Sequence, residues 1–295
     1  MPEPFRFLVA ESESPEDREA RRASAGRSSG ETYADTLRAL APGAICDQVK
    51  PAEESAPAPD AAMIARYDAV FLCGSPLHVY SDTPETRRLL GFMRAVFAAG
   101  APAFGSCAGL QVAAAAAGGQ VGARKQGQEA GFARRITATA EGRAHPLLAG
   151  RPAAFDAPAI HSDEVTRLPP GATLLATSDG TPIQAAEIRH GAGVFWGVQY
   201  HPELSLREVA EALRRQSEGL VRGGLARDGD AVERHAAKIE ALAADPGRRD
   251  LAWQLGLDRQ VTEAALRRTE LRNFIRHLAE PRRARRCAAR PGGFP

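Results

Sequence analysis

Apolar and polar positions alternate in blocks along the first 120 residues. Apolar runs predict short strands at residues 5–9, 45–49 and 69–73, and a further run at 102–104 leads into a glycine-rich turn. Helices are predicted at residues 32–40, 85–99 and 110–117. The polar stretch 11–30 and the proline-rich stretch 51–60 are predicted to be loops. Between residues 132 and 196 the pattern becomes rich in β-strand, with alternating runs at 134–139, 173–178 and 183–189. Strands that alternate with helices predict an α/β fold with a doubly wound, mostly parallel sheet and a small β-rich portion.

The C-terminal quarter of the chain has a different pattern. Residues 219–229 are glycine-rich and charged, which predicts a hinge, and helical periodicity follows at 231–244 and 251–279. We therefore expect a main domain at 1–218 and a helical, Arg-rich extension at 219–295 that ends in a disordered tail.

The arginines near the C-terminus allow two interpretations. They either form a docking surface for an acidic partner or nucleic acid, or they belong to a solvated helix face. Interspersed glutamates favour the solvated face, and Phe274 and Trp253 fit core packing better than base stacking. We therefore expect no nucleic-acid partner and expect both aromatic side chains to be buried.

Composition adds few further constraints. The chain has 295 residues, 44% of them hydrophobic, and a formal net charge of +2, which calls for neither nucleic acid nor an anionic membrane. No apolar stretch reaches 18 residues, and the N-terminus is interpreted as a strand, not a signal peptide. The four cysteines show no metal-ligand spacing, so we expect free thiols in a reducing, cytoplasmic compartment with no metal and no cofactor.

The segment around Cys107 carries the strongest chemical signal. Cys107 stands between Gly105 and Gly109, after an apolar run and before an alanine-rich helix, which is the pattern of a nucleophile elbow. Such a turn places the thiol at the carboxyl edge of a sheet and at a helix N-terminus, where the backbone N–H of Ala108 can face an oxyanion. The alternative is a buried structural cysteine in a glycine-rich turn.

A second segment supplies the partners that a thiol nucleophile needs. An apolar run from residue 193 stops at His201-Pro202-Glu203, and proline cannot continue a central strand, so His201 lies at a strand end. A cysteine nucleophile needs a base, and the base needs a group that orients it. Cys107, His201 and Glu203 can fill these roles, although a strand-end histidine can also simply bind a backbone carbonyl.

Over residues 5–215 the sequence resembles the class I, triad-type glutamine amidotransferases, particularly the glutaminase portion of GMP synthase. The elbow at 105–111 and the His-Pro-Glu segment match the family patterns, and so, less closely, do Cys73-Gly74-Ser75-Pro76 and Ile160-His161-Ser162-Asp163. The resemblance implies a flavodoxin-like fold with antiparallel strands in the β-rich portion. It also implies roles for several residues: catalysis by Cys107, His201 and Glu203, an oxyanion hole from the N–H groups of Ser75 and Ala108, and substrate contacts from Gly74, Gln111, His161 and Ser162.

Ser75 departs from the family pattern, which has glycine there. Since a residue with a Cβ tolerates a positive φ less well than glycine, we expect the Ser75 N–H to be partly misoriented and basal activity to be weak. His78, near this turn, is a weaker candidate for the pocket wall.

The resemblance predicts a glutaminase that uses L-glutamine and delivers ammonia to a separate synthetase or acceptor protein, because the chain lacks the Ser-Gly-Gly-x-Asp-Ser loop of an ATP pyrophosphatase. A γ-glutamyl hydrolase or peptidase with the same Cys-His-Glu triad is the first alternative. A non-catalytic binding protein on this fold is the second. The sequence leaves the acceptor and the oligomeric state open.

Overall fold

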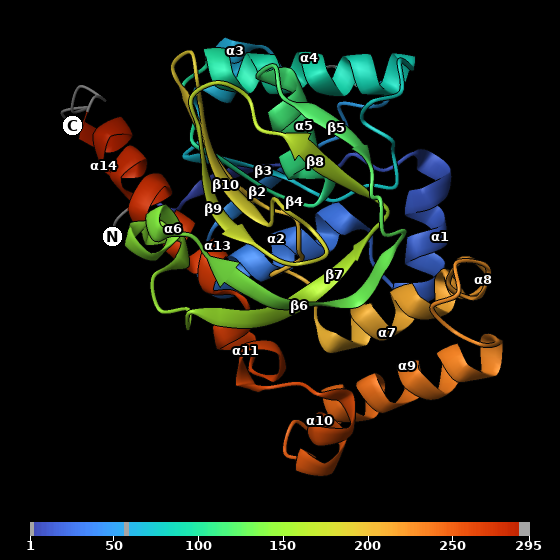
Figure 1. Ribbon diagram of the computed structural model, residues 1–295. Coiled ribbons are helices and arrows are strands. Elements are labelled where there is room, and N and C mark those ends of the chain that lie inside the picture. The colour runs from blue at the N-terminus through green and yellow to red at the C-terminus, as the bar shows by residue number, and fades with distance from the viewer. Residues whose placement is uncertain (1–2, 56–58, 289–295) are drawn as a thin grey trace.

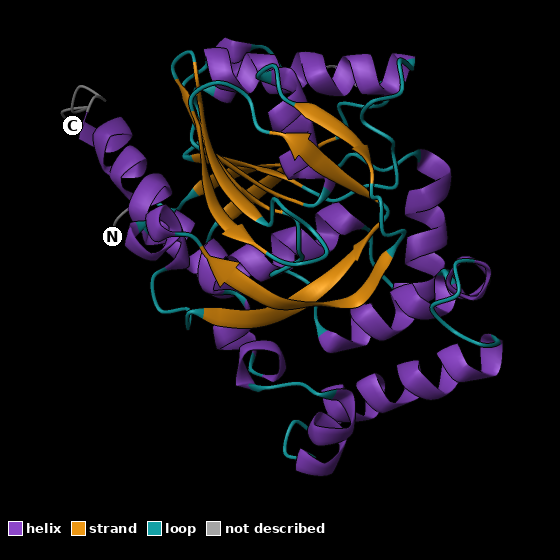
Figure 2. Cartoon of the chain, viewed as in Figure 1, coloured by secondary structure: helices purple, strands orange, loops and turns teal. Residues whose placement is uncertain are grey.

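The computed structural model describes residues 3–55 and 59–288, and within them nine strands form one large sheet (Figures 1 and 2). In spatial order these are β2 (Ile45–Val49), β1 (Arg6–Ala10), β3 (Ala69–Leu72), β4 (Ala103–Ser106), β11 (Gly193–Val198), β10 (Ala185–His190), β9 (Ala172–Thr177), β6 (Glu129–Ala138) and β7 (Ala154–His161). The strands from β2 to β11 run parallel, and those from β11 to β7 pair antiparallel. A separate antiparallel pair joins β5 (Gln120–Ala123) to β8 (Asp163–Arg167). The predicted α/β fold and its antiparallel portion are confirmed.

Helices cover both faces of the parallel strands, as the doubly wound pattern requires (Figure 1). One face packs on α4 (Pro84–Ala98) and α5 (Ala108–Ala116), whose Phe92, Met93 and Leu110 meet apolar side chains of β3 and β11. The opposite face packs on α2 (Ser29–Leu40), which contributes Tyr33 and Leu37. Shorter elements complete this part: α3 (Ala61–Ile64), α6 (Ala140–Ala144) and the 3₁₀ turn η1 (Pro146–Leu148).

The polar stretch predicted to be a loop contains a helix, α1 (Pro15–Ala25), so that prediction was wrong. Ser14 caps it by accepting from the Asp17 N–H, and Pro15 occupies its first turn. The helix has no apolar stripe, and its buried residue is Arg18, which pairs with Glu11 and Glu53. Charge pairing therefore holds α1 in place, which a search for apolar periodicity does not detect.

The C-terminal quarter folds as a run of helices (Figure 1). Its first helices pack on α7 (Leu206–Arg215), and its later ones pack on the core of the large sheet. Its members are α8 (Ser217–Arg222), α9 (Gly229–Ala244), α10 (Arg249–Leu255), α11 (Arg259–Thr262), α12 (Ala264–Arg267), α13 (Thr269–Phe274), the π-helical turn η2 (Ile275–Ala279) and α14 (Glu280–Ala288). α9 packs on α7 in an apolar cluster that includes Leu213 and Ile239. The expected tail runs to residue 295, and residues 289–295 lie outside the described residues.

The two aromatic side chains of the extension behave differently. Phe274 is fully buried and contacts Phe71, Phe104 and Trp196 in the main core, as predicted. Trp253 is 83% exposed, so the prediction that it packs in the core was wrong. It lies on the short helix α10, whose buried residues are Leu251 and Leu255.

Candidate active site

Cys107 lies at the junction of β4 and α5, in the strained turn that the elbow pattern predicts. Its φ of 52° and ψ of −111° are unusual for a residue with a Cβ, and it is the residue immediately before the first turn of α5. Its backbone N–H donates to the Val198 carbonyl at 2.8 Å, which ties the turn to the end of β11. The side chain is almost buried, and its thiol donates to the Ile160 carbonyl at 3.9 Å.

Two glycines make this turn possible because backbone atoms press against them. A Cβ on Gly105 would lie 2.8 Å from the Gly109 carbonyl carbon, and a Cβ on Gly109 would lie 2.6 Å from the Leu72 carbonyl oxygen. Both distances are shorter than real Cβ atoms allow. The Gly-x-Cys-x-Gly spacing therefore has a packing reason at both ends.

His201 lies three residues beyond the end of β11 and joins Cys107 to a buried carboxylate. Its Nδ1 is 2.7 Å from Glu203 Oε1, its backbone N–H donates to the Pro158 carbonyl at 2.7 Å, and its ring lies next to the Cys107 side chain beside Gly74. Glu203 Oε2 accepts from the Ser106 hydroxyl at 2.9 Å, and Ser106 is bonded to the Tyr33 hydroxyl at 2.5 Å. Sequence reasoning missed this link from Glu203 to Ser106, the residue next to Cys107.

The local charges set the protonation of His201. Burial lowers the pKa of its imidazole, but the Glu203 carboxylate and the Cys107 side chain raise it, with the net result that the pKa is about 10 instead of the ordinary 6.5. His201 is therefore protonated across the neutral pH range.

The turn after β3 contacts the His201 ring through Gly74. A Cβ on Gly74 would lie 2.8 Å from His201 Cε1 and 3.6 Å from Cys107 Cβ, so only glycine fits without moving the imidazole. Among the described residues the non-glycines with positive φ are Cys107 and Arg135, so Ser75 does not adopt the positive φ that serine tolerates poorly. Its hydroxyl instead donates to the Ser12 carbonyl at 3.1 Å and accepts from the Leu77 N–H at 3.0 Å. The expected misorientation of the Ser75 N–H, and the weak basal activity that would follow from it, remain predictions.

The residues expected to contact substrate line one wall of the same cavity. Gln111 is buried, and its amide donates to the Asp163 carbonyl at 3.0 Å and to Gln199 Oε1 at 3.3 Å. His161 bonds through Nδ1 to the Asp163 carbonyl and through Nε2 to Glu129, both at 2.9 Å, so neither ring nitrogen is free to serve Cys107. Ser162 is exposed beside it in the wall.

His78 also lines the cavity, where its Nδ1 lies 2.6 Å from Asp163 Oδ2. Its side chain is about half exposed, which places it at the rim.

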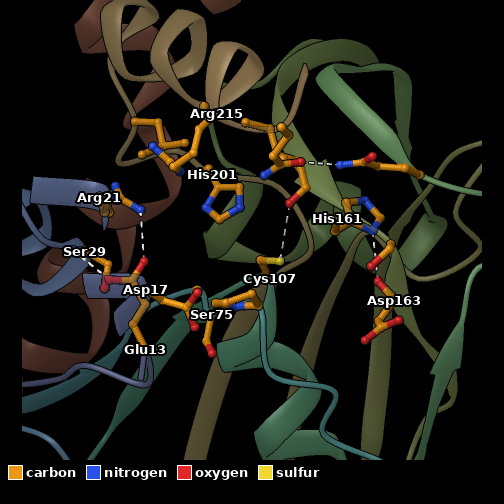
Figure 3. Close-up of a pocket in the computed structure, with 18 of the residues that line it drawn as sticks. Glu13, Asp17, Arg21, Ser29, Ser75, Cys107, His161, Asp163, His201 and Arg215 are labelled. Atoms are coloured by element: carbon orange, nitrogen blue, oxygen red, sulfur yellow. Dashed lines mark hydrogen bonds and ion pairs between the residues drawn. The ribbon is translucent and has the colours of Figure 1, made fainter. Parts of the chain in front are cut away.

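The cavity around Cys107 has a volume of about 510 Å³, and it has a second wall that sequence reasoning missed (Figure 3). Glu13, Asp17 and Arg21 reach it from α1 and the loop before it, and Arg215 reaches it from the end of α7. Figure 3 shows His161 and Asp163 on one side of Cys107, and Glu13, Asp17 and Arg21 on the other. The Ser14-Pro15-Glu16-Asp17 sequence is a helix start signal that could have revealed α1.

No group of three or more His, Cys, Asp or Glu side chains in residues 3–55 and 59–288 is arranged to hold a metal ion. The same residues contain no helix with the length and apolar character needed to cross a membrane. Cys46, Cys73, Cys107 and Cys287 are all free thiols.

The fold and the elbow define a class, and comparison with known proteins identifies it. The family model described as "Glutamine amidotransferase class-I" matches residues 37–217. This protein belongs to the class I glutamine amidotransferase family.

Among its relatives is a γ-glutamyl-L-1-hydroxyisopropylamide hydrolase from Pseudomonas sp.. The two are 38% identical over 224 residues, which cover 74% of this chain and 75% of the hydrolase. GMP synthase from Leifsonia xyli subsp. xyli is 33% identical over 144 residues, but these cover only 27% of that enzyme and 49% of this chain.

Solved structures agree on the fold. A glutamine amidotransferase from Thermotoga maritima superposes with a TM-score of 0.64 at 18% identity, covering 94% of this chain and 99% of its own. A glutamine amidotransferase from Methylobacillus flagellatus gives a TM-score of 0.56 at 19% identity, covering 97% of this chain and 96% of its own.

Proposed function

We propose that this protein hydrolyses γ-glutamyl amides to glutamate and an amine through a thioester on Cys107. The observation that carries the proposal is the buried chain of contacts from Cys107 through His201 to Glu203, at a nucleophile elbow that opens into a 510 Å³ cavity. Ligand sites commonly have volumes of about 300–1,000 Å³, so the cavity has room for more than glutamine alone.

In the proposed reaction the Cys107 thiolate attacks the γ-carbonyl carbon, and the carbonyl oxygen becomes an oxyanion. Backbone N–H groups of Ser75 and Ala108 are the candidate donors to it, and no acceptor occupies either of them among the described residues. His201 gives its proton to the leaving nitrogen as the C–N bond breaks, which leaves a γ-glutamyl thioester on Cys107.

Water completes the cycle. His201, now neutral, takes a proton from the water that attacks the thioester carbon, and the C–S bond breaks to release glutamate and the thiolate. The sum is one amide and one water converted to glutamate and one amine. Glu203 holds the imidazole in one orientation and stabilises its charged form, while Gly74, Gln111, His161 and Ser162 form the wall where we place the γ-glutamyl group.

The leaving amine distinguishes two candidate functions. The Pseudomonas relative, similar over three quarters of both chains, acts on a γ-glutamyl amide by its name, which favours an amine larger than ammonia. Similarity to GMP synthases favours the second candidate, a glutaminase that takes L-glutamine and passes ammonia to a partner synthetase, although the chain spans only about a quarter of those relatives.

Steady-state kinetics of the purified protein test the proposal. Glutamate release would be compared for glutamine and γ-glutamylethylamide, in wild type, Cys107→Ser and the matched control Cys46→Ser. We expect turnover of the ethylamide at least equal to that of glutamine, a fall of about a thousandfold or more in Cys107→Ser, and little change in Cys46→Ser. Activity that survives in Cys107→Ser overturns the proposal, and turnover of glutamine alone supports the glutaminase instead.

A further inference from the structure

The protonation step fixes which side of Cys107 the leaving amine occupies. The general acid must reach the leaving nitrogen, so in the proposed function the amine lies beside His201, away from the wall of Gln111, His161 and Ser162. The wall on that other side is formed by Glu13, Asp17, Arg21 and Arg215, which we call the α1–α7 wall. In this arrangement the side chains of the α1–α7 wall determine which leaving amines the cavity accepts.

Arg21 in this wall is a partly buried cation that makes two ion pairs but no side-chain hydrogen bond among the described residues. Its side chain is 15% exposed, and its Nε is buried and has no acceptor in residues 3–55 and 59–288. Its nearest carboxylate oxygens among the described residues are Glu13 Oε1 at 3.6 Å and Glu208 Oε1 at 3.8 Å, which are ion-pair distances and not hydrogen bonds. Buried guanidinium donors are nearly always paired, so Arg21 is poised for an anionic acceptor.

Arg215 brings a second guanidinium to the same end of the cavity. It is exposed and donates to the Ser24 hydroxyl at 2.9 Å; desolvation and the charge of Arg21 lower its pKa, whereas Glu13, Glu211 and Asp17 raise it. Two cations that disfavour one another across a cavity gain from an anion placed between them. A carboxylate is the anion whose planar shape suits guanidinium groups.

Glu13 and Asp17 place negative charge next to the two arginines of the α1–α7 wall. Glu13 is buried and accepts from the Ser29 N–H at 3.3 Å, and Asp17 accepts from the Ser14 hydroxyl at 2.8 Å. Both carboxylates line the cavity beside the arginines. When the leaving nitrogen takes the His201 proton, and a further proton from solvent, it becomes an ammonium that these carboxylates can receive.

We propose that the α1–α7 wall is a subsite for a leaving amine that carries a carboxylate, so that the preferred substrates are γ-glutamyl amino acids. The released amino acid is a zwitterion whose carboxylate meets Arg21 and Arg215 and whose ammonium meets Glu13 and Asp17. This inference rests on the proposed function. It adds the substrate class that the hydrolysis alone does not specify.

Matched substrates and matched variants test the subsite. Rates of glutamate release would be measured for γ-glutamylglycine and its neutral analogue γ-glutamylglycinamide, in wild type, Arg215→Gln, Arg215→Lys and the control Arg222→Gln. Arg222 is an exposed residue at the end of α8, outside this cavity. We expect wild type to prefer γ-glutamylglycine by about tenfold or more in kcat/KM, because charge-assisted hydrogen bonds to the carboxylate are lost in the analogue.

Arg215→Gln should reduce that preference toward one, Arg215→Lys should retain part of it, and Arg222→Gln should keep it. Equal rates for the two substrates in wild type overturn the subsite while leaving γ-glutamyl hydrolysis intact. An equal loss on both substrates in Arg215→Gln also overturns it, since Arg215 would then bind the γ-glutamyl end that they share. Failure to hydrolyse either compound or glutamine would instead overturn the proposed function itself and the subsite with it.

Discussion

Individual residues of the candidate site could be identified from the sequence where the chain has a strict local requirement. Cys107 needed glycines on both sides, and both are in contact with backbone that leaves no room for a Cβ. His201 follows an apolar run that stops at Pro202, and the carboxyl ends of β4 and β11 are neighbours in the sheet. Ser106 and Tyr33 carry no such signal, because their link to Glu203 depends on contacts between distant segments.

The pH dependence of the Glu203→Gln variant tests how the carboxylate acts on His201. With the pKa of His201 at about 10, kcat/KM in wild type should fall on the alkaline side only as pH approaches 10, when the general acid loses its proton. Glu203→Gln removes a charge that raises this pKa, so the alkaline fall should move toward the ordinary value of 6.5. A pH profile of both proteins measures the shift, and identical alkaline limbs would show that Glu203 does not set the protonation of His201.

The same shift has a consequence for folding. Because the pKa of His201 is raised in the folded protein, its contribution to stability is present below about pH 6.5 and is lost as pH rises through about 10. Thermal unfolding of wild type at these pH values provides an independent check on the kinetic result.

At the scale of elements, apolar patterning predicted the parallel strands and the helices that cover them. It missed β7 and β8, and it failed at α1, where charge replaces apolar contact. β3 is buried throughout and was predicted nearly residue for residue. α1 was missed because Arg18, Glu11 and Glu53 hold it. Asp17 and Arg21 lie on this helix, and Glu13 lies just before it. Because the helix was not predicted, the sequence analysis also did not predict that these three residues line the cavity.

The turn after β3 gives a prediction at this scale. Gly74→Ala places a methyl group 2.8 Å from His201 Cε1, so the imidazole must move away from Cys107 or Glu203. We expect kcat to fall about a hundredfold with a small change in the melting temperature, since a misplacement of about 1 Å can cost that much. Gly91→Ala, on α4 with nothing within 4 Å of the new methyl, is the control and should keep full activity and gain about 0.5–1 kcal/mol of stability. Wild-type kcat in Gly74→Ala would mean that the ring tolerates the contact.

At the scale of the whole molecule, the C-terminal extension and the large sheet contribute side chains to one hydrophobic core. Phe274 contacts Phe71 and Phe104 in the main core, and the buried Glu270 pairs with Arg151 and accepts from the Tyr200 hydroxyl. Arg286 forms an ion pair with the buried Asp68. Periodicity predicted helices at 231–244 and 251–279, which include Glu270 and Phe274 but not α14. It could not predict their partners, because a helix pattern indicates which face is buried and not what covers it. The division of the chain at residue 218 remains a prediction about independent folding.

Phe274→Ala tests that division directly. If the extension folds together with the sheet, the cavity left among Phe71, Phe104 and Trp196 should destabilise the whole protein by about 3–5 kcal/mol and lower a single thermal transition. Trp253→Ala, the matched control on the same extension, removes an aromatic side chain that is 83% exposed and should change stability by less than about 0.5 kcal/mol. Calorimetry and glutamate release would be followed on the same samples, since a shared core predicts that activity disappears in the same transition. Two separate transitions, with only the minor one shifted by Phe274→Ala and activity lost only in the other, would instead show that residues 1–218 fold and function as a unit of their own.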